Sequence, residues 1–251
     1  MTRIAAMMTC LLRVVIAGAQ SAVAVTAEPH HHQVYADAHV RVFSVEVPGH
    51  ASTLLHQHDR DYVWVALGEA AFINAVAGKP DAPVAAADGS VHFARGGFAH
   101  VARNPGVAPF RNVTIELLEP ADNPRNLCEP VLAGEPIDCP AGPAAGDAGY
   151  RGASVHPALA TDRMRVSVLA IATGGTLRVA PSKNARLLIA IGDVAGPSTL
   201  ACGVPGEAPS TPLRLRSGQG LVPSPLVDCA VRNGGRAAMR WVAIDFKGEM
   251  R

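Results

Sequence analysis

The chain has 251 residues, of which 49% are hydrophobic, and this is enough material for one large β domain or two small ones. Its formal net charge is +1 and it has no sustained basic run, which argues against nucleic acid as a partner. Only 4% of its residues are aromatic, so the composition offers no stacking platform for bases or sugars.

The N-terminus is typical of an export signal. Arg3 precedes an apolar stretch that Arg13 interrupts, residues 14–25 are small and apolar, and Val25-Thr26-Ala27 offers a small-residue cleavage site. We therefore expect residues 1–27 to be a signal peptide, with an uncleaved leader as the alternative, and the mature protein to be secreted or periplasmic. No later apolar run approaches the roughly 20 residues that span a bilayer, so stable membrane insertion is not expected.

The triplet His30-His31-His32 lies just past the expected cleavage site. Its position is typical of a flexible, exposed tail. The alternative is a segment that binds metal loosely or passes it inward.

Residues 34–120 predict a first β barrel. Apolar and polar side chains alternate over residues 40–47 and 112–117, and residues 62–67 form an apolar run, as expected of strands. The composition then shifts to Pro, Gly, Ala and Asp, which indicates a linker over residues 121–150.

Residues 151–251 predict a second barrel that repeats the plan of the first. Residues 165–171 resemble residues 41–47, residues 185–192 resemble residues 61–68, and residues 240–246 supply a closing strand. Internal self-similarity of this kind indicates a duplicated barrel.

The cysteines support export. If Cys10 leaves with the leader, an even number remains, which suggests disulfides. Of the three possible pairings we favour Cys128–Cys139 with Cys202–Cys229, because each pair then stays within one region. The first would staple the Pro-rich connector, and the second would join two loops of the C-terminal half.

Two segments carry histidines at regular spacing. In the first, Gly49 is followed after six residues by His56-Gln57-His58, and Gly68 closes the hairpin. The second runs from Gly89 through Arg95-Gly96-Gly97 to His100 and Asn104. Side chains two apart on a strand share a face, so His56 and His58 project to the same side, and a barrel can bring His100 opposite them. Three converging imidazoles make an open site for a divalent transition metal.

These two segments resemble the two metal-binding motifs of the cupin superfamily, over residues 49–104. The resemblance implies an all-β fold of two double-stranded β-helix (jelly-roll) barrels in tandem, a bicupin whose barrels pack edge to edge. The N-terminal barrel would bind metal. The C-terminal barrel would be degenerate, because Ala180 and Ser182 fall where His56 and His58 stand and no histidine follows His156.

The chain departs from the cupin pattern at two positions. The family has a carboxylate after the paired histidines, where this chain has Tyr62 with Asp61 one residue earlier, and Arg95 replaces the usual proline. By strand parity Tyr62 shares the face of His58 and Asp61 does not, although a turn could reverse this. We therefore expect His56, His58 and His100 to bind the metal, with Asp61 as a candidate fourth ligand and Tyr62 as a hydroxyl beside the site. The loss of a hard ligand disfavours Mn²⁺ and leaves Fe²⁺, Ni²⁺, Cu²⁺ and Zn²⁺ open.

The resemblance to three-His cupin oxygenases implies an exported, Fe²⁺-dependent dioxygenase that acts on a small organic molecule. Tyr62 and Arg95 would orient an anionic substrate, the alternative for Arg95 being a solvated turn residue. A second hypothesis is a non-catalytic bicupin that binds a metal or a small ligand, and a third is a hydrolase or isomerase in which Zn²⁺ activates water. A homo-oligomer is compatible with each of them, and the sequence identifies no catalytic acid or base.

Overall fold

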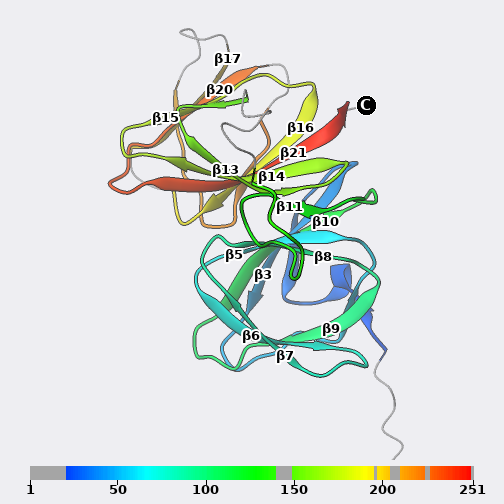
Figure 1. Ribbon diagram of the computed structural model, residues 1–251. Helices are drawn as coiled ribbons and strands as arrows, with labels where there is room; N and C mark the ends of the chain where they lie inside the picture. The colour runs from blue at the N-terminus through cyan, green and yellow to red at the C-terminus, as the bar shows by residue number, and fades with distance from the viewer. Residues whose placement is uncertain (1–20, 140–148, 195–196, 204–209, 224–226, 250–251) are drawn as a thin grey trace, which may run out of the picture.

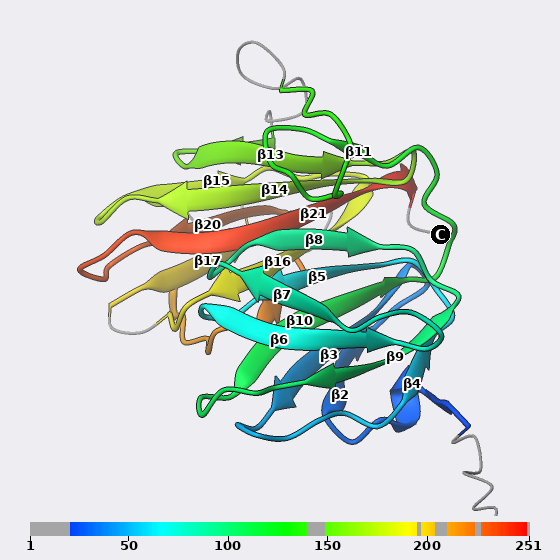
Figure 2. The same cartoon turned by 60° about the horizontal axis from the view of Figure 1, so that its bottom comes forward.

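The computed structural model describes residues 21–139, 149–194, 197–203, 210–223 and 227–249, which form two β barrels stacked on one another (Figures 1 and 2). This confirms the predicted all-β fold of two tandem barrels. Among the described residues, no helix is long and apolar enough to cross a membrane.

The first barrel consists of two five-stranded sheets, in the orders β1-β4-β9-β6-β7 and β2-β3-β10-β5-β8. Its strands are β1 (Val23–Ala24), β2 (His31–Ala36), β3 (Val40–Val47), β4 (His56–His58), β5 (Tyr62–Ala66), β6 (Ala70–Val76), β7 (Ala82–Ala86), β8 (Val91–Ala94), β9 (Phe98–Arg103) and β10 (Phe110–Leu117). The strands expected over residues 40–47, 62–67 and 112–117 are β3, β5 and β10, each within two residues of the expected ends.

The second barrel has a six-stranded sheet, β11-β13-β14-β21-β16-β19, and a five-stranded sheet, β12-β15-β20-β17-β18. Its strands are β11 (Arg125–Asn126), β12 (Tyr150–Arg151), β13 (Ser154–Ala160), β14 (Met164–Ile171), β15 (Thr176–Val179), β16 (Asn184–Ile191), β17 (Thr199–Gly203), β18 (Thr211–Pro212), β19 (Gly220–Leu221), β20 (Asp228–Arg232) and β21 (Met239–Glu249). Within the expected linker 121–150, β11 and the start of β12 pair with strands of this barrel, and residues 140–148 lie outside the described residues.

Residues 1–20 of the expected leader also lie outside the described residues. The last part of that leader is described and belongs to the first barrel. β1 pairs in parallel with β4, so that Val23 lies opposite His56, and a 3-10 helix follows over Val25–Ala27. Val25 is buried in the barrel.

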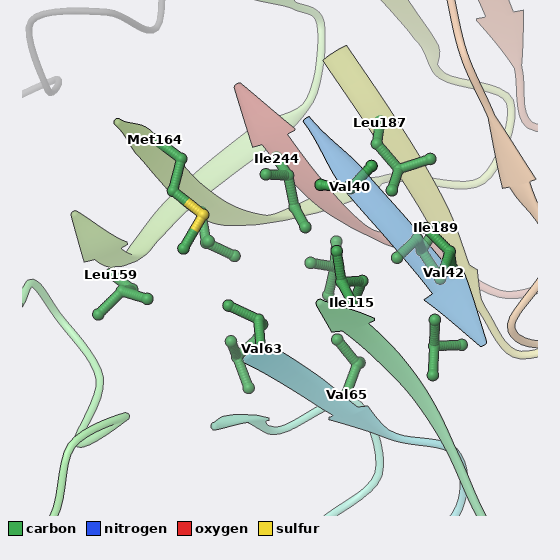
Figure 3. Packing of buried hydrophobic residues seen from close by; sticks show 14 of the residues in the cluster. Val40, Val42, Val63, Val65, Ile115, Leu159, Met164, Leu187, Ile189 and Ile244 are labelled. Carbon is green, nitrogen blue, oxygen red and sulfur yellow. The ribbon is translucent and has the colours of Figure 1, made fainter. Parts of the chain in front are cut away.

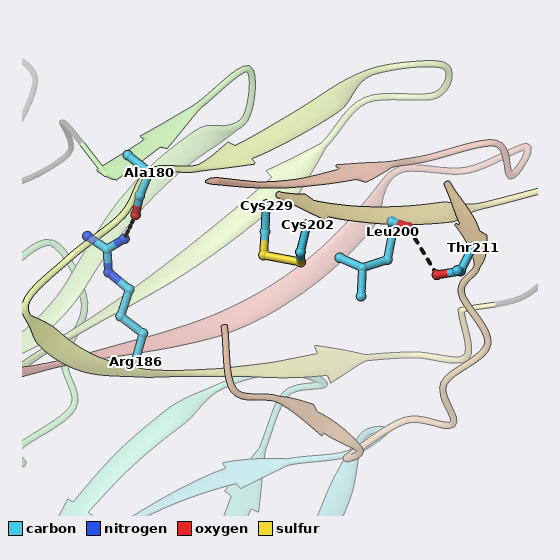
Figure 4. Close-up of a disulfide and its surroundings, with 6 residues drawn as sticks. All are labelled: Ala180, Arg186, Leu200, Cys202, Thr211 and Cys229. Carbon is cyan, nitrogen blue, oxygen red and sulfur yellow. Dashed lines mark hydrogen bonds between the residues drawn. A yellow bond between two sulfur atoms is a disulfide. The ribbon is translucent and has the colours of Figure 1, made fainter. Parts of the chain in front are cut away.

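Both expected cysteine pairs form disulfides in the structure. Cys202 on β17 lies directly opposite Cys229 on β20, and their disulfide joins the two strands (Figure 4). Cys128 and Cys139 close a loop that follows β11. The buried Asn126 side chain, on β11 just before this loop, bonds to the backbone of Leu132 and Glu135 within it, so these bonds attach the loop to β11.

The two barrels pack face to face, so the expectation of edge-to-edge packing was wrong. Along β5 and β10 successive side chains alternate between the two faces of the sheet. The outward-facing Val63, Val65 and Ile115 pack against Leu187 and others from the second barrel in one continuous apolar cluster (Figure 3). The inward-facing side chains of the same strands line the interior of the first barrel.

The interior of the second barrel is filled with apolar side chains. Trp241, Leu169, Ile171 and Leu177 are completely buried and pack in one cluster. In the first barrel, the corresponding interior contains a polar centre, described below.

Asn104 and Asn233 occupy equivalent places in the two barrels and make the same set of hydrogen bonds. The amide of Asn104 donates to the carbonyls of Val47, Pro48 and Ala108 and accepts from the N–H of Gly106. The amide of Asn233 binds the backbone of its own barrel in the same pattern, at Ile171, Ala172, Ala237 and Gly235. This repeat supports the interpretation of the chain as a duplication.

Replacing Asn104 or Asn233 by alanine should destabilise the protein by similar amounts. Each change leaves buried carbonyls without a donor, at a cost of about 1–3 kcal/mol per site. Urea unfolding of the two variants measures this, with exposed Asp81→Ala as the control. A loss confined to one of the two positions would contradict their equivalence.

Candidate metal centre

Four histidines from three strands meet inside the first barrel. His56 and His58 lie on β4 and His100 lies directly opposite His56 on the neighbouring β9. The alternation along β4 turns both histidines inward and leaves Gln57 between them exposed. The fourth, His31, comes from β2 in the other sheet.

The rings form one cluster. The metal-binding nitrogens of His31, His56 and His58 all lie within 4.8 Å of one another. His100 adjoins this group, with its ring centroid 4.4 Å from that of His56 and 5.4 Å from that of His58. The three histidines expected from the motifs therefore lie together, and His31 lies with them.

Hydrogen bonds to Nδ1 fix the orientation of three of these rings. Nδ1 of His56 lies 3.0 Å from the carbonyl oxygen of Leu54, and Nδ1 of His31 lies 2.6 Å from a carboxylate oxygen of Glu28. Those oxygens can only accept, so in each ring Nδ1 carries the proton and Nε2 keeps its lone pair. Nδ1 of His100 lies 2.7 Å from Oδ1 of Asn74 in the same way.

Two of the resulting lone pairs have no hydrogen-bond donor among the described residues. Nε2 of His56 and Nε2 of His100 are buried and have no hydrogen-bond partner among the described residues. His58 has its Nδ1 3.7 Å from a carboxylate oxygen of the buried Glu116, too far for a hydrogen bond. Neutral imidazoles held at one nitrogen and open at the other are the form in which histidine binds a metal.

Burial favours the neutral form of His31, His56 and His100. It lowers the pKa of His56 to about 4, helped by the neighbouring His31 and His58. It lowers the pKa of His100 to about 2, again with the other histidines adding to the effect. The pKa of His31 is lowered by burial as well, although Glu28 opposes the shift.

Asp61 and Arg95 are not part of the centre. They bind each other, with Nη1 of Arg95 2.7 Å from Oδ2 of Asp61, while Oδ1 of Asp61 accepts from the N–H of Gly96. Arg95 also donates to the carbonyl of Ala121, and its side chain is half exposed. The pair links the end of β8 to the turn before β5. Asp61 is therefore not a fourth ligand, and Arg95 is not placed to orient a substrate.

Tyr62 lies beside the centre, on β5 of the other sheet, and lines the same cavity as His58. Its ring stacks on that of His58 with centroids 4.2 Å apart. Burial, with the nearby Glu116, raises the pKa of the Tyr62 hydroxyl, which therefore stays protonated at neutral pH.

A cavity of about 360 Å³ adjoins the four histidines. Its wall is largely aromatic, and it includes Tyr62, Trp64 and Phe98. Val131 and Ala133, from the loop closed by Cys128–Cys139, also line it, so a segment that belongs to neither sheet of the first barrel closes part of the cavity. This volume lies within the range of about 300–1,000 Å³ that is typical of small-molecule pockets.

Neither His31 nor its partner Glu28 was predicted to lie in the barrel. His31 was expected in a flexible tail, but β2 places it in the barrel, where it is buried while His32 is exposed. Glu28, three residues before His31, is buried too and accepts hydrogen bonds from His31, from the N–H of His30 and from the N–H of Leu54. Burial alone would raise the pKa of Glu28, but these bonds lower it below its usual value.

Glu28→Gln should weaken metal binding by about 10- to 100-fold, because a carboxylate behind a metal-binding histidine orients the ring and raises its basicity. Competition with a chromogenic chelator measures the affinity, and Glu46→Gln, an exposed change on β3, serves as the control. Equal affinities for the two variants would contradict a positioning role for Glu28.

Comparisons with known proteins support the fold alone. No protein-family model and no curated protein sequence matches the chain. Among solved structures, AerE from Microcystis aeruginosa is similar with a TM-score of 0.55 and 12% identity, over 88% of this chain and 99% of that protein. Vicilin from tomato, Solanum lycopersicum, has a TM-score of 0.53 and 12% identity, over 82% of this chain and 74% of that protein.

A variant of salicylate 1,2-dioxygenase from Pseudoaminobacter salicylatoxidans, in complex with gentisate, is similar as well. Its TM-score is 0.53 with 10% identity, over 82% of this chain and 68% of the dioxygenase. A cupin 2 conserved barrel domain protein from Leptotrichia buccalis has a TM-score of 0.50 and 7% identity, over 86% of this chain and 88% of that protein. With two jelly-roll barrels in tandem, the chain has the two-barrel fold of a bicupin.

Proposed function

We propose that the first barrel holds one divalent transition metal through His31, His56, His58 and His100. The observation that carries the proposal is the pair of buried Nε2 atoms on His56 and His100, which have no hydrogen-bond partner among the described residues. Leaving a buried polar atom unpaired costs about 1–3 kcal/mol, and a metal ion would satisfy both lone pairs together. His31 takes the place that the sequence analysis gave to Asp61.

The donor set favours a borderline metal. It consists of imidazole nitrogens, which suit iron, nickel, copper and zinc, and it has no carboxylate among the ligands to favour manganese. Glu28 and Glu116 lie behind His31 and His58, where their charge helps to offset that of the ion.

We propose iron as the metal and the oxygen-dependent oxidation of a small organic molecule as the reaction. Support comes from the resemblance to three-His cupin oxygenases and from the fold shared with a salicylate dioxygenase. When bound, iron would supply the place at which oxygen and the substrate meet. The chain itself contributes aromatic walls that exclude water, and Tyr62, packed on His58, holds that ring in place.

Oxygen uptake tests this function. The protein would be loaded with Fe²⁺ without air and then offered oxygen with small aromatic compounds in turn. We expect oxygen consumption matched by loss of one compound, and none with zinc-loaded protein or with His56→Ala. Tight metal binding without turnover would instead support the alternative, a bicupin that only binds a metal or small ligand.

We also propose that the protein is exported and cleaved after Ala27. The two disulfides support an oxidising compartment. Cleavage there would remove β1 and its pairing with β4, and would leave Glu28 as the first residue. Fractionation and the intact mass of the mature chain test both points, and a mature chain that retains residues 21–27 would contradict this boundary.

A further inference from the structure

We infer that the cavity beside the histidines takes a neutral, flat aromatic molecule and disfavours a carboxylate anion. This inference rests on the proposed function, because it names the class of molecule that would meet the metal. It deepens that function and reverses the earlier expectation of an anionic substrate.

The charge of the cavity wall is the first observation. Of the described residues that line the cavity, none is a lysine, arginine, aspartate or glutamate. The cation expected to meet an anion, Arg95, is not on the wall and is paired with Asp61. A carboxylate moved from water into such a cavity would lose its hydration without gaining a cationic partner from the protein.

His92 does not supply that cation either. It lines the cavity away from the metal ligands, stacks on Trp64 with ring centroids 3.9 Å apart, and lies with Nε2 2.9 Å from Oγ of Ser90. Burial lowers its pKa to about 4, so it is neutral at pH 7.

The shape of the wall is the second observation. Trp64, Phe72 and Phe110 form a connected aromatic group, in which Phe72 and Phe110 stack with centroids 4.3 Å apart and Trp64 meets each edge-on. On the metal side, Phe98 meets His100 edge-on with centroids 5.3 Å apart. Aromatic rings pack best against other rings, in offset or edge-on arrangements, so these surfaces fit a flat ring system.

The polar groups on the wall are neutral. The side-chain Oδ1 of Asn112 accepts a hydrogen bond from the Thr114 hydroxyl, and this bond does not use the amide N–H groups of Asn112. Both residues line the cavity, and the hydroxyl-bearing Tyr62 does so as well. Such groups recognise a hydroxyl, carbonyl or amide on an otherwise apolar ligand.

Two probes of nearly identical shape separate charge from size. Naphthalene-2-carboxamide is neutral and naphthalene-2-carboxylate is an anion, and both would be titrated by fluorescence into metal-free protein at pH 7, because a bound metal ion would itself offer the carboxylate a cationic partner. We expect the amide to bind at least about tenfold more tightly. Equal affinities, or tighter binding of the carboxylate, would overturn the inference.

Variants place the binding and separate the two proposals. Phe72→Ala should weaken amide binding, whereas Arg95→Ala should leave the affinity for both probes unchanged. Val84→Lys, at a half-buried position on the wall, should improve carboxylate binding. An affinity for the amide that is unchanged in Phe72→Ala, or an affinity for the carboxylate that falls in Arg95→Ala, would contradict the inference. Because these titrations use metal-free protein, they do not depend on the metal proposal, and a failure of that proposal would be visible separately.

Discussion

Replacing His56 by alanine is expected to reduce bound metal from about one ion per chain to background while the barrel stays folded. His56 is completely buried, its Nε2 has no other partner among the described residues, and its ring lies between those of His31 and His100. Equilibrium dialysis against Zn²⁺, followed by elemental analysis, measures the loss.

His92→Ala is the matched control for this variant. His92 is a histidine on the wall of the same cavity, but it stacks on Trp64 away from the cluster. It should bind metal as the wild type does. Equal metal content in the His56 and His92 variants would show that the cavity, or some other part of the chain, binds metal without the cluster.

The second large effect is expected at the contact between the barrels. Ile115→Ala should destabilise the protein by about 2–5 kcal/mol, because the side chain is completely buried in the cluster that both barrels share. Since that cluster joins the two barrels, they should unfold in one transition. Val107→Ala, at a position that is 84% exposed, should change the stability very little.

The two tryptophans allow the unfolding of each barrel to be followed separately. Trp64 lies in the first barrel and Trp241 in the second, and the chain has no others. In urea, the fluorescence of Trp64→Phe reports on the second barrel and that of Trp241→Phe on the first. Coincident midpoints, lowered together by Ile115→Ala, are expected, and separate midpoints would contradict a shared core.

The strands and the motif histidines could be predicted from the sequence because both rest on local periodicity. Alternation over residues 40–47 and 112–117 matched β3 and β10, and the spacing of His56, His58 and His100 placed all three in the cluster. The Tyr62 ring stacks on that of His58, but the two residues lie on strands of different sheets, whereas parity had predicted that they share one face. Asp61, which parity placed on the other face, lies in the ion pair with Arg95.

The parts of the fold and of the site that could not be predicted depend on contacts between distant segments. His31 reaches the centre because β2 pairs with β3, and no motif in residues 31–36 predicts that pairing. Asn74, whose side chain is hydrogen-bonded to His100, lies 26 residues earlier in the chain. A clue to the face-to-face packing was present in residues 62–67, since an unbroken apolar run is typical of a strand buried on both faces.

The most direct test of the metal centre is elemental analysis of the protein purified without a histidine tag from the compartment in which it accumulates. We expect about one transition-metal ion per chain, with iron as the main element, and a marked loss in both His31→Ala and His100→Ala. Metal at background in the wild-type protein, even after Fe²⁺ and Zn²⁺ are offered in excess, would contradict the proposed metal centre.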